Sequence, residues 1–491
     1  MVPNHPNGEK YFKTPLTLDM EYAMYPRLKE DHDLLPALME AVCAHASGVC
    51  TNIDSSPVAV KPRQFVLSEL PARGIGAEAV LQLFGSSVSP SLSASAGPRH
   101  LGFVTGGATP AAMLGDWLTS VYDQNPVSNL DSATALQVER HTVAMLRSLF
   151  GLSSEFEGTL VSGATMSNFV GLAVAREWAG RACGVRVSDE GISAMPRPGI
   201  FSATPHSSTT KALSMLGIGR KMWQEIPSLL RREAMDMGAL EQRLAACAGP
   251  AIIIASAGTV NTGDFDDFTE LVRLKQSYGF YLHIDAAFGG FASVSPDLRP
   301  LLKGWSCADS ICIDLHKWLN VPYDSAVAFT RHRDLQMDVF ANVSAYLSHD
   351  LDDPEPVHLA PENSHRWRAL PAWFTLMAYG EEGYREIVER DCRLARKLGQ
   401  RLQQSDDFEL LAPVQLNIVC FALKNPDVTA RFIEAVRDSG RTLVTPTVFK
   451  GTPAIRAAFS NWRTTDVDLD IAWQAFQTAS RALSKRRTKE F

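Results

Sequence analysis

The sequence predicts an α/β protein built around a mostly parallel β-sheet. Between about residues 100 and 330, short β-branched runs alternate with helical segments. Strand, helix and strand at this spacing are typical of right-handed crossovers and of a sheet covered by helices on both faces. The strand-like runs are GTLV (158–161), GIFSAT (199–204), AIIIAS (251–256), YLHID (281–285), SICID (310–314) and SAVAFT (325–330).

The rest of the chain divides into an arm and a small domain. Residues 1–99 contain one clear helical stretch and several Pro/Ser-rich connections, so we expect an extended N-terminal arm with one or two helices. Residues 100–374 form the expected large domain. A long charged helix, then the strand-like runs LNIVCFAL (416–423) and AIRAAFSN (454–461), predict a small C-terminal α/β domain over residues 375–491.

Composition narrows the class of protein. The chain has 491 residues, of which 45% are hydrophobic and 21% charged, as in soluble globular proteins. The net charge of −7 argues against a nucleic-acid partner. We see no apolar run long enough to span a bilayer and no signal-peptide pattern. The eight cysteines form no CxxC pair, which favours free thiols in the cytoplasm over disulfides or a metal site.

Candidate functional groups stand at the ends of successive strand-like runs, where ligands of parallel sheets bind. The small-residue turn at 162–165 precedes a helix whose N-terminus attracts phosphate. His206, Asp285 and Lys317 follow three later strands. Each feature alone has a commoner structural explanation, namely turn packing, a loop histidine, a helix cap and an ion-paired lysine.

Together, these groups match the needs of pyridoxal phosphate. This cofactor takes a lysine for a Schiff base, an acid beside its pyridine nitrogen, a planar group over its ring and a phosphate site. Lys317, Asp285, His206 and the turn at 162–165 supply one of each. The presence of all four groups at the strand ends of one predicted sheet therefore indicates a pyridoxal-phosphate enzyme.

The chain resembles the group II pyridoxal-phosphate-dependent decarboxylases, the family of aromatic amino acid, histidine and glutamate decarboxylases. The likeness runs from about Leu70 to the end of the chain. It is carried in order by RHLGFVTGGATPAAMLGDWLTSVYDQN (99–125), ATPHSSTTKA (203–212), GTVNTGDFDD (258–267), HIDAAFGG (283–290), HKWLNVPYD (316–324) and AIRAAFSNWRTTDVDLD (454–470).

The resemblance implies the aspartate aminotransferase-like fold (fold type I) and a homodimer with its active site near the subunit interface. It implies decarboxylation of an L-amino acid to an amine and carbon dioxide, through aldimine and quinonoid intermediates. Lys317 would hold the cofactor, and its burial would keep part of the amine unprotonated. Asp285 would keep the pyridine nitrogen protonated, while His206 and Ala287 would flank the ring. The other cofactor contacts implied are Ala164, Thr165, Thr259, Asp314 and His316.

In this family a loop after the lysine strand presents a tyrosine that protonates the carbanion. Tyr346 lies 29 residues beyond Lys317, which suits that role. The alternative is a surface aromatic residue on a long loop. If the tyrosine were absent, an aldehyde synthase would be expected, in which the carbanion meets oxygen; Tyr346 argues against that.

The substrate is less well defined. Gly97-Pro98 stands where His-Pro is usual, with His100 two residues later, and Val260 replaces a threonine. Phe103 is followed by Val-Thr-Gly-Gly, which indicates a looser pocket for an aliphatic, acidic or larger amino acid. We expect Phe103, His100 and Arg366 to contact the substrate, although Arg366 and Arg368 have a structural role as the alternative.

Two further alternatives concern the class of reaction. A transaminase or a Cβ lyase could share the fold, but the His-Ser-Ser and His-Lys-Trp motifs argue against both. A scaffold that keeps the fold without catalysis is disfavoured by the intact Lys317, Asp285 and His206. A visible absorption band from the bound cofactor would separate an enzyme from a scaffold.

Overall fold

The computed structural model describes residues 24–61, 69–342 and 354–487. The chain forms two compact units, one of residues up to 52 with 61–92 and one of residues 53–60 with 93–491. The α-helices of the first unit are α1 (Pro26–Asp33), α2 (Leu35–Asn52) and α3 (Ala77–Leu83). None of their residues is buried. No single described helix is long and apolar enough to cross a membrane. Only α1 and α2 taken together have the length and composition of a membrane span, and the pair is bent by 66°.

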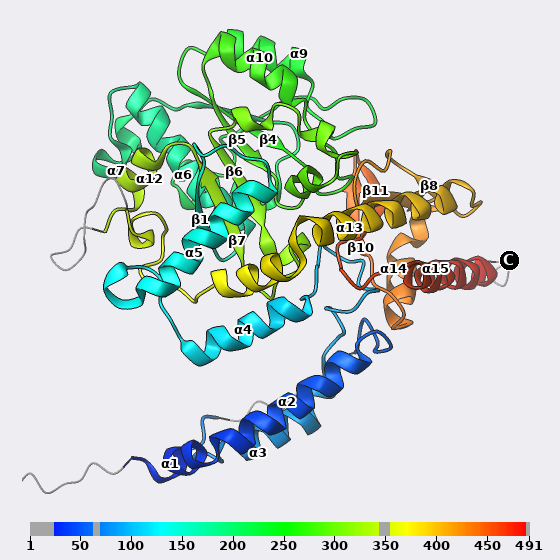
Figure 1. Cartoon of the computed structure of the whole chain (residues 1–491). Helices are drawn as coiled ribbons and strands as arrows, with labels where there is room; N and C mark the ends of the chain where they lie inside the picture. The colour runs from blue at the N-terminus through cyan, green and yellow to red at the C-terminus, as the bar shows by residue number, and fades with distance from the viewer. Residues whose placement is uncertain (1–23, 62–68, 343–353, 488–491) are drawn as a thin grey trace, which may run out of the picture. The chain divides into compact units, whose positions relative to one another are not determined.

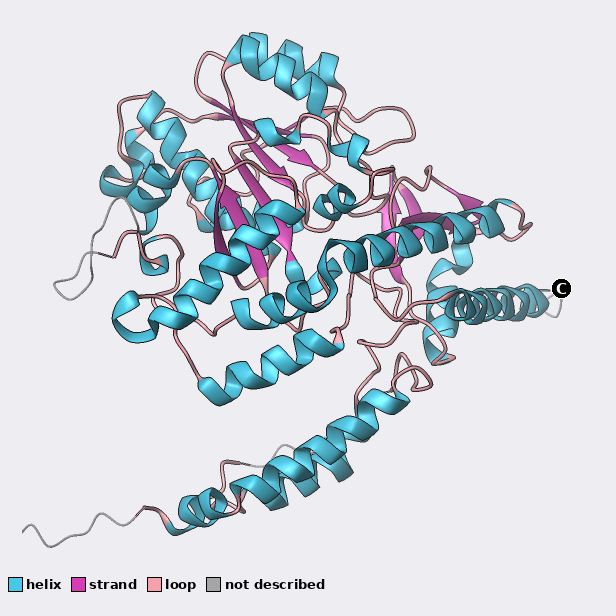
Figure 2. Ribbon diagram, viewed as in Figure 1, coloured by secondary structure: helices cyan, strands magenta, loops and turns pink. Residues whose placement is uncertain are grey.

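The second unit is built on a seven-stranded sheet of order β1-β7-β6-β5-β4-β2-β3 (Figure 2). Only β7 runs antiparallel to its neighbours, β1 and β6. The prediction of a mostly parallel sheet is therefore confirmed. The strands are β1 (Glu157–Val161), β2 (Gly199–Ser202), β3 (Gln224–Glu225), β4 (Ala251–Ser256), β5 (Tyr281–Asp285), β6 (Ser310–Asp314) and β7 (Ala326–Thr330).

Helices pack on both faces of this sheet (Figure 1). The helix α6 lies against β5, β6 and β7 on one face, and the end of α5 packs on the other. The helices of this part are α4 (Pro110–Tyr122), α5 (Asn129–Leu149), α6 (Ala164–Ala182), α7 (Val187–Glu190), α8 (Ser207–Met215), α9 (Met237–Ala245), α10 (Phe268–Tyr278), α11 (Leu315–Trp318) and α12 (Arg333–Phe340).

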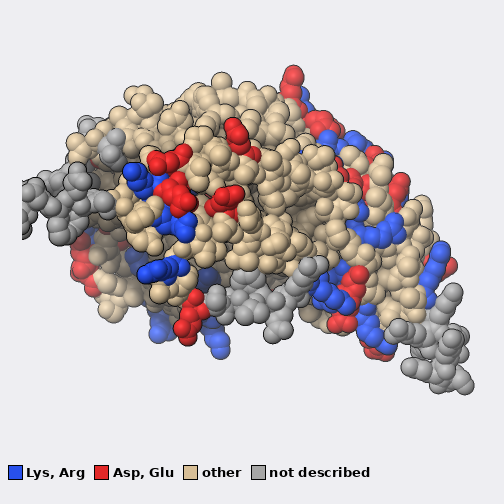
Figure 3. Space-filling view, turned by 90° about the horizontal axis from the view of Figure 1, so that it is seen from below, with Lys and Arg blue, Asp and Glu red and all other residues tan. Residues whose placement is uncertain are grey.

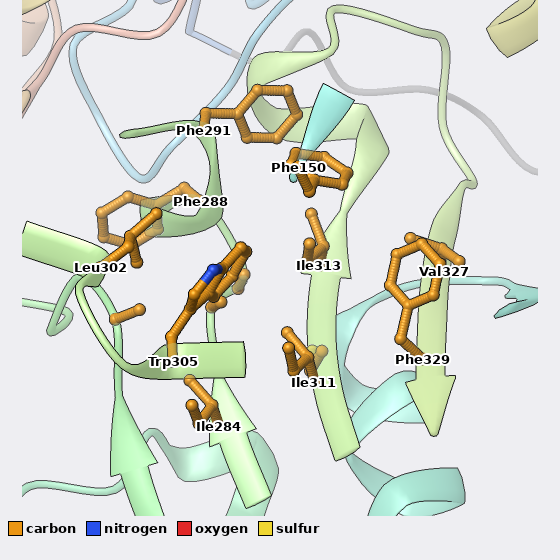
Figure 4. Close-up of a cluster of buried hydrophobic side chains, with 14 of the residues drawn as sticks. Phe150, Ile284, Phe288, Phe291, Leu302, Trp305, Ile311, Ile313, Val327 and Phe329 are labelled. Carbon is orange, nitrogen blue, oxygen red and sulfur yellow. The ribbon is translucent and has the colours of Figure 1, made fainter. Parts of the chain in front are cut away.

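Alternation along β5 and β6 places apolar side chains on one face of the sheet and several polar ones on the other. Ile284, Ile311 and Ile313 point into the large hydrophobic core with Phe150 and Phe291 (Figure 4). Each fully buried side chain of this size contributes about 1.5–3 kcal/mol. Since neighbouring residues of a strand face opposite sides, the residues between these isoleucines project toward α6. That second face carries the polar groups described below.

A four-stranded antiparallel sheet of order β10-β11-β9-β8 forms the C-terminal part, which confirms the predicted small α/β region. Its core includes the edge-to-face pair Phe408–Phe421. Its elements are α13 (Ala369–Gln403), β8 (Phe408–Leu410), β9 (Ile418–Leu423), α14 (Thr429–Asp438), β10 (Thr445–Phe449), β11 (Thr452–Ala458) and α15 (Asp466–Arg487). The domain boundaries after residues 99 and 374 stay predictions, and residue 375 falls within α13.

Candidate active site

A cavity of about 390 Å³ lies where several strands of the large sheet end. Most of the predicted site residues line it, although they come from distant parts of the chain. They are Phe103, Ala164, Thr165, His206, Thr259, Asp285, Ala287, Asp314, His316 and Lys317.

A larger cavity of about 1010 Å³ lies at the opposite edge of the sheet, beside Gly199, Pro250 and Gly279, next to the starts of β2, β4 and β5. Its walls are largely apolar and hold no carboxylate or histidine. The titratable groups converge in the smaller cavity. We therefore take the smaller cavity, and not the larger one, as the candidate active site.

Lys317 lies on the short helix α11, directly after β6. Its Nζ is 3.0 Å from Asp314 Oδ2. Burial is the largest influence on the Lys317 pKa and lowers it, but the carboxylates of Asp314 and Asp285 together outweigh burial and raise that pKa. The expectation that burial would leave part of the amine unprotonated is therefore wrong for this set of protein groups, because two acids stabilise the ammonium.

Asp285 ends β5 and is held by two hydrogen bonds. Asn168 Nδ2, on α6, donates to Asp285 Oδ2 at 3.0 Å. The backbone N–H of Ala287 donates to Oδ1 at 3.2 Å. The carboxylate is thus fixed at the cavity wall without a direct cation contact, as an acid that must face a pyridinium nitrogen requires.

His206 caps the helix α8. Its Nδ1 accepts from the backbone N–H of Ser208 at 3.2 Å and lies 2.7 Å from Ser208 Oγ. Burial lowers the pKa of His206 below its usual value, against the pull of Asp285. The imidazole is therefore neutral near pH 7, which suits a ring that stacks on another ring.

The N-terminus of α6 faces the cavity and is partly occupied. The backbone N–H of Ala164 donates to Asp314 Oδ1 at 2.6 Å. Thr165 lines the cavity at the next position. His316 lies 3.4 Å from the same Asp314 oxygen and contacts Tyr323 in a tilted arrangement, with ring centroids 4.4 Å apart. Phosphate contacts from Ala164 and Thr165 stay a prediction, with Thr165 the less engaged of the two.

The glycine-rich segment after Phe103 has a different purpose from the one expected. A Cβ on Gly106 would collide with the carbonyl oxygen of Lys317. Asn320 Nδ2 donates to the carbonyls of Gly106 and Ser460, each at 2.7 Å. The glycine therefore permits close approach of two backbones rather than widening the pocket.

Sequence reasoning missed Arg456. This residue lies on β11 of the small sheet and lines the same cavity. It is 9% exposed, and its Nε has no hydrogen-bond partner among the described residues. Burial lowers the Arg456 pKa to about 10, still well above neutrality. The available signal was a charge inside the otherwise apolar run AIRAAF.

Two predicted residues, His100 and Arg366, do not line the cavity. His100 is buried and forms a β-bridge with Leu443. Arg366 Nη2 donates to Asp116 Oδ1 of α4 at 2.8 Å, and both side chains of this ion pair are partly exposed. Their substrate contacts stay predictions; for Arg366 the geometry agrees with the structural alternative. Tyr346 lies outside the described residues.

The residues present fit pyridoxal phosphate. Lys317 offers the amine, Asp285 an oriented carboxylate, His206 a neutral ring and α6 a helix N-terminus. The guanidinium of Arg456, whose Nε has no hydrogen-bond partner among the described residues, remains for an anionic group. When bound, the cofactor supplies an electron sink for the pair of electrons released from a bond to Cα.

The fold is that of pyridoxal-phosphate enzymes of fold type I. The structure of TDC from Oryza sativa with PLP and tryptamine superposes with a TM-score of 0.85, at 20% identity, over 92% of this chain and 98% of that one. The pyridoxal-dependent decarboxylase conserved domain matches residues 66–424. The chain therefore belongs to the pyridoxal-dependent decarboxylase family and is a carboxy-lyase that acts on an amino acid with pyridoxal phosphate, as the motifs predicted.

Two curated relatives show how the family's reactions vary. The aromatic-L-amino-acid decarboxylase of Bacillus atrophaeus is 26% identical over 424 residues, which cover 83% of this chain and 86% of that protein. The 3,4-dihydroxyphenylacetaldehyde synthase of Drosophila melanogaster is 28% identical over 296 residues, covering 59% of this chain and 55% of that protein. Sequence identity of 26–28% does not identify the substrate. The residues that line the cavity are therefore the evidence for it.

Proposed function

We propose that the enzyme decarboxylates an L-amino acid with an apolar or aromatic side chain and releases the amine. The observation that carries this proposal is the pairing of charges in the cavity. Lys317 already has Asp314 as its partner, whereas the guanidinium of Arg456 faces the cavity without a carboxylate partner in the described structure. One substrate carboxylate would satisfy it.

The remaining wall supports an uncharged side chain. Phe103, Val104, Val260, Phe288 and Tyr323 line the cavity. No second unpaired cation lines the described part of the cavity to receive a side-chain carboxylate. A charged side chain would lose its hydration there without gaining a partner, which is costly.

The protein groups divide the work of the reaction. Arg456 would pair with the carboxylate of the incoming substrate, and Asp285 would hold a proton at the pyridine nitrogen. Lys317 would accept and return protons at the amine. The apolar wall would exclude water, which strengthens these interactions.

Protonation at Cα decides between amine and aldehyde as product. We assign this proton to the Tyr346 hydroxyl, because its spacing from Lys317 matches the family's loop tyrosine. The aldehyde remains the alternative product, since a relative is an aldehyde synthase.

The assembly would be a homodimer, and the compartment a reducing cytoplasm in which the eight cysteines stay free. Apolar side chains on helices of each unit support the dimer. Met39, Val42 and Val49 of α2 are about half exposed, and so are Leu114 and Val121 of α4. Residues other than Lys, Arg, Asp and Glu cover most of the face seen in Figure 3. A second copy of the chain would cover such surfaces.

The test is a screen of amino acids for carbon dioxide release, with products identified by mass. Phenylalanine, tyrosine, tryptophan and leucine should be turned over faster than glutamate and 2,4-diaminobutyrate. Arg456→Gln should raise KM by about 10- to 100-fold, the worth of a hydrogen-bonded charge pair. Arg366→Gln is the matched control and should leave KM unchanged. Preference for glutamate, or equal effects of the two variants, would contradict the proposal.

A further inference from the structure

A connected set of buried polar side chains lies behind the cavity, on the α6 face of the sheet. His283 lies two residues before Asp285 on β5, so both side chains project to the same face. Asn168 and His283 are fully buried, as is Ser310 at the start of β6. None of the three lines the cavity. Burying three polar side chains is favourable only if their hydrogen bonds are made.

These hydrogen bonds are made without a gap. His283 Nδ1 is 2.8 Å from Ser310 Oγ, and His283 Nε2 is 2.9 Å from Asn168 Oδ1. Asn168 Nδ2 donates to Asp285 Oδ2 at 3.0 Å and to Ser208 Oγ at 3.1 Å. Ser208 Oγ in turn lies 2.7 Å from His206 Nδ1. The chain of contacts thus links Ser310 to both groups that flank the cofactor site.

The direction of each bond follows from what the groups can donate. An ionised Asp285 only accepts, so Asn168 must turn its NH₂ toward it and its oxygen toward His283. His283 Nε2 must then carry a proton, and its Nδ1 accepts from the Ser310 hydroxyl. Burial lowers the pKa of His283 to about 4, so the ring holds this single proton at neutral pH.

The same logic continues to His206. Ser208 Oγ accepts from Asn168, which leaves the hydroxyl proton of Ser208 free to point at His206 Nδ1. The backbone N–H of Ser208 points at the same nitrogen, at 3.2 Å. Since Nδ1 accepts from both, a neutral His206 must carry its proton on Nε2.

The helix α6 is shaped to admit His283. Gly171 lies three residues after Asn168, on the same side of the helix. A Cβ at Gly171 would come within 2.7 Å of both Cε1 and Nδ1 of His283. Glycine inside a helix lowers helix stability by about 1 kcal/mol relative to alanine. At position 171 this loss is offset because the missing side chain leaves space for the His283 imidazole.

We propose that Asn168, His283 and Ser310 form a positioning relay that orients the Asp285 carboxylate and holds the Ser208 hydroxyl so that it donates to His206 Nδ1. The relay touches neither substrate nor cofactor. It rests on the proposed function only in that Asp285 and His206 act on the cofactor. Its effect on His206 can be measured in the protein alone, so it fails or holds separately from the substrate assignment.

Two variants of the full chain break the relay at different points. Asn168→Leu has a similar volume and removes every bond that the amide makes. Gly171→Ala displaces His283 and leaves Asn168 in place. Gly180→Ala is the matched control, because it lies on the same helix and its Cβ would clash with Val187 instead. It should lower stability without touching the relay.

The first measurement is the tautomer of His206, by ¹⁵N NMR of the protein labelled at its 12 histidines, with the His206→Gln variant to assign the signal. The wild type and Gly180→Ala should show one tautomer protonated on Nε2. Because the backbone N–H of Ser208 still points at Nδ1, Asn168→Leu should keep this tautomer but shift its Nδ1 signal, since the Ser208 hydroxyl is no longer held by Asn168. Gly171→Ala should show a smaller shift of the same signal.

The second measurement is affinity for pyridoxal phosphate, by absorbance titration. Asn168→Leu and Gly171→Ala should each weaken it by about 10- to 100-fold, the worth of hydrogen bonds to a charged group. An unshifted His206 Nδ1 signal with affinity within about threefold of wild type in Asn168→Leu would overturn the proposal, whether or not Gly171→Ala folds. An equal loss of affinity in Gly180→Ala would also overturn it, since helix stability would then be the cause.

Discussion

At the scale of single residues, the site depends on which charges are already paired. Lys317 and Asp314 satisfy each other, and Asp285 is held by an amide and a backbone N–H. Arg456 is left for an anion. Substitutions that remove one of these groups should therefore have distinct consequences.

Lys317→Ala should abolish turnover and the visible absorption band of the bound cofactor, because no other amine of the described structure lines the cavity. Absorption spectra with added pyridoxal phosphate and a carbon dioxide assay check this. Lys397→Ala, which breaks an exposed pair with Asp466, is the control and should behave as wild type. Undiminished decarboxylation by Lys317→Ala would refute the role given to this lysine.

Tyr346→Phe should keep carbon dioxide release but lower the amine yield by about 10²-fold or more, the usual worth of a positioned acid. Oxygen should then react at Cα and give an aldehyde, ammonia and peroxide. An oxygen electrode and product analysis by mass distinguish the outcomes. If amine yield is unchanged and no oxygen is consumed, another group delivers the proton.

At the scale of elements, the four-residue helix α11 is fixed from two sides. Asn320 ties it to Gly106 and to Ser460 of the small sheet region. Trp318, the neighbour of Lys317, donates from Nε1 to Asp391 Oδ2 of α13 at 2.8 Å. A helix this short has little stability of its own, so these contacts position the lysine.

The buried Asp391 makes this arrangement sensitive to pH. Burial raises its pKa to about 8 in the folded chain, from 3.8. Its contribution to stability is therefore present below pH 4 and is lost as the pH rises toward 8, because only the unfolded state ionises freely in that interval. Asp391→Asn cannot titrate, so we expect its free energy of unfolding to fall less than that of wild type between pH 5 and pH 8.

Urea unfolding at both pH values measures this difference. Asp466→Asn is the control: the hydrogen bond from Lys397 lowers the pKa of the exposed Asp466, so its titration is complete below pH 5. It should shift stability equally at both pH values. Parallel pH dependence of Asp391→Asn and wild type would show that Asp391 is already ionised in the fold.

At the scale of the whole molecule, the proposed dimer would cover apolar residues that the single chain exposes. Val42→Glu, on α2, should weaken association because a charge would be buried without a partner. Sedimentation velocity should show a shift from dimer to monomer. Glu40→Gln, also exposed on α2, should leave the dimer intact, and a monomeric wild type would contradict the assignment.

The sequence by itself determined the sheet, the family and most of the cavity. Strand periodicity and the order of motifs placed His206, Asp285 and Lys317 after the ends of three strands, β2, β5 and β6, and the structure brings them together. Local patterns suffice for this, because strands of a parallel sheet present their carboxyl ends at one edge.

Only the tertiary structure decided how distant residues meet. Arg456 enters the cavity from β11, some 140 residues beyond Lys317. The charge within the apolar run AIRAAF marks the residue as unusual, but it does not say which distant residues Arg456 meets. Gly106 reads as an open pocket in sequence but is a backbone crossing in space. The pKa of Lys317 rises rather than falls because Asp314 and Asp285 both face it. The position of Arg456, the backbone crossing at Gly106 and the pKa of Lys317 all depend on how separate elements pack together. The spacing of residues along the chain does not determine that packing.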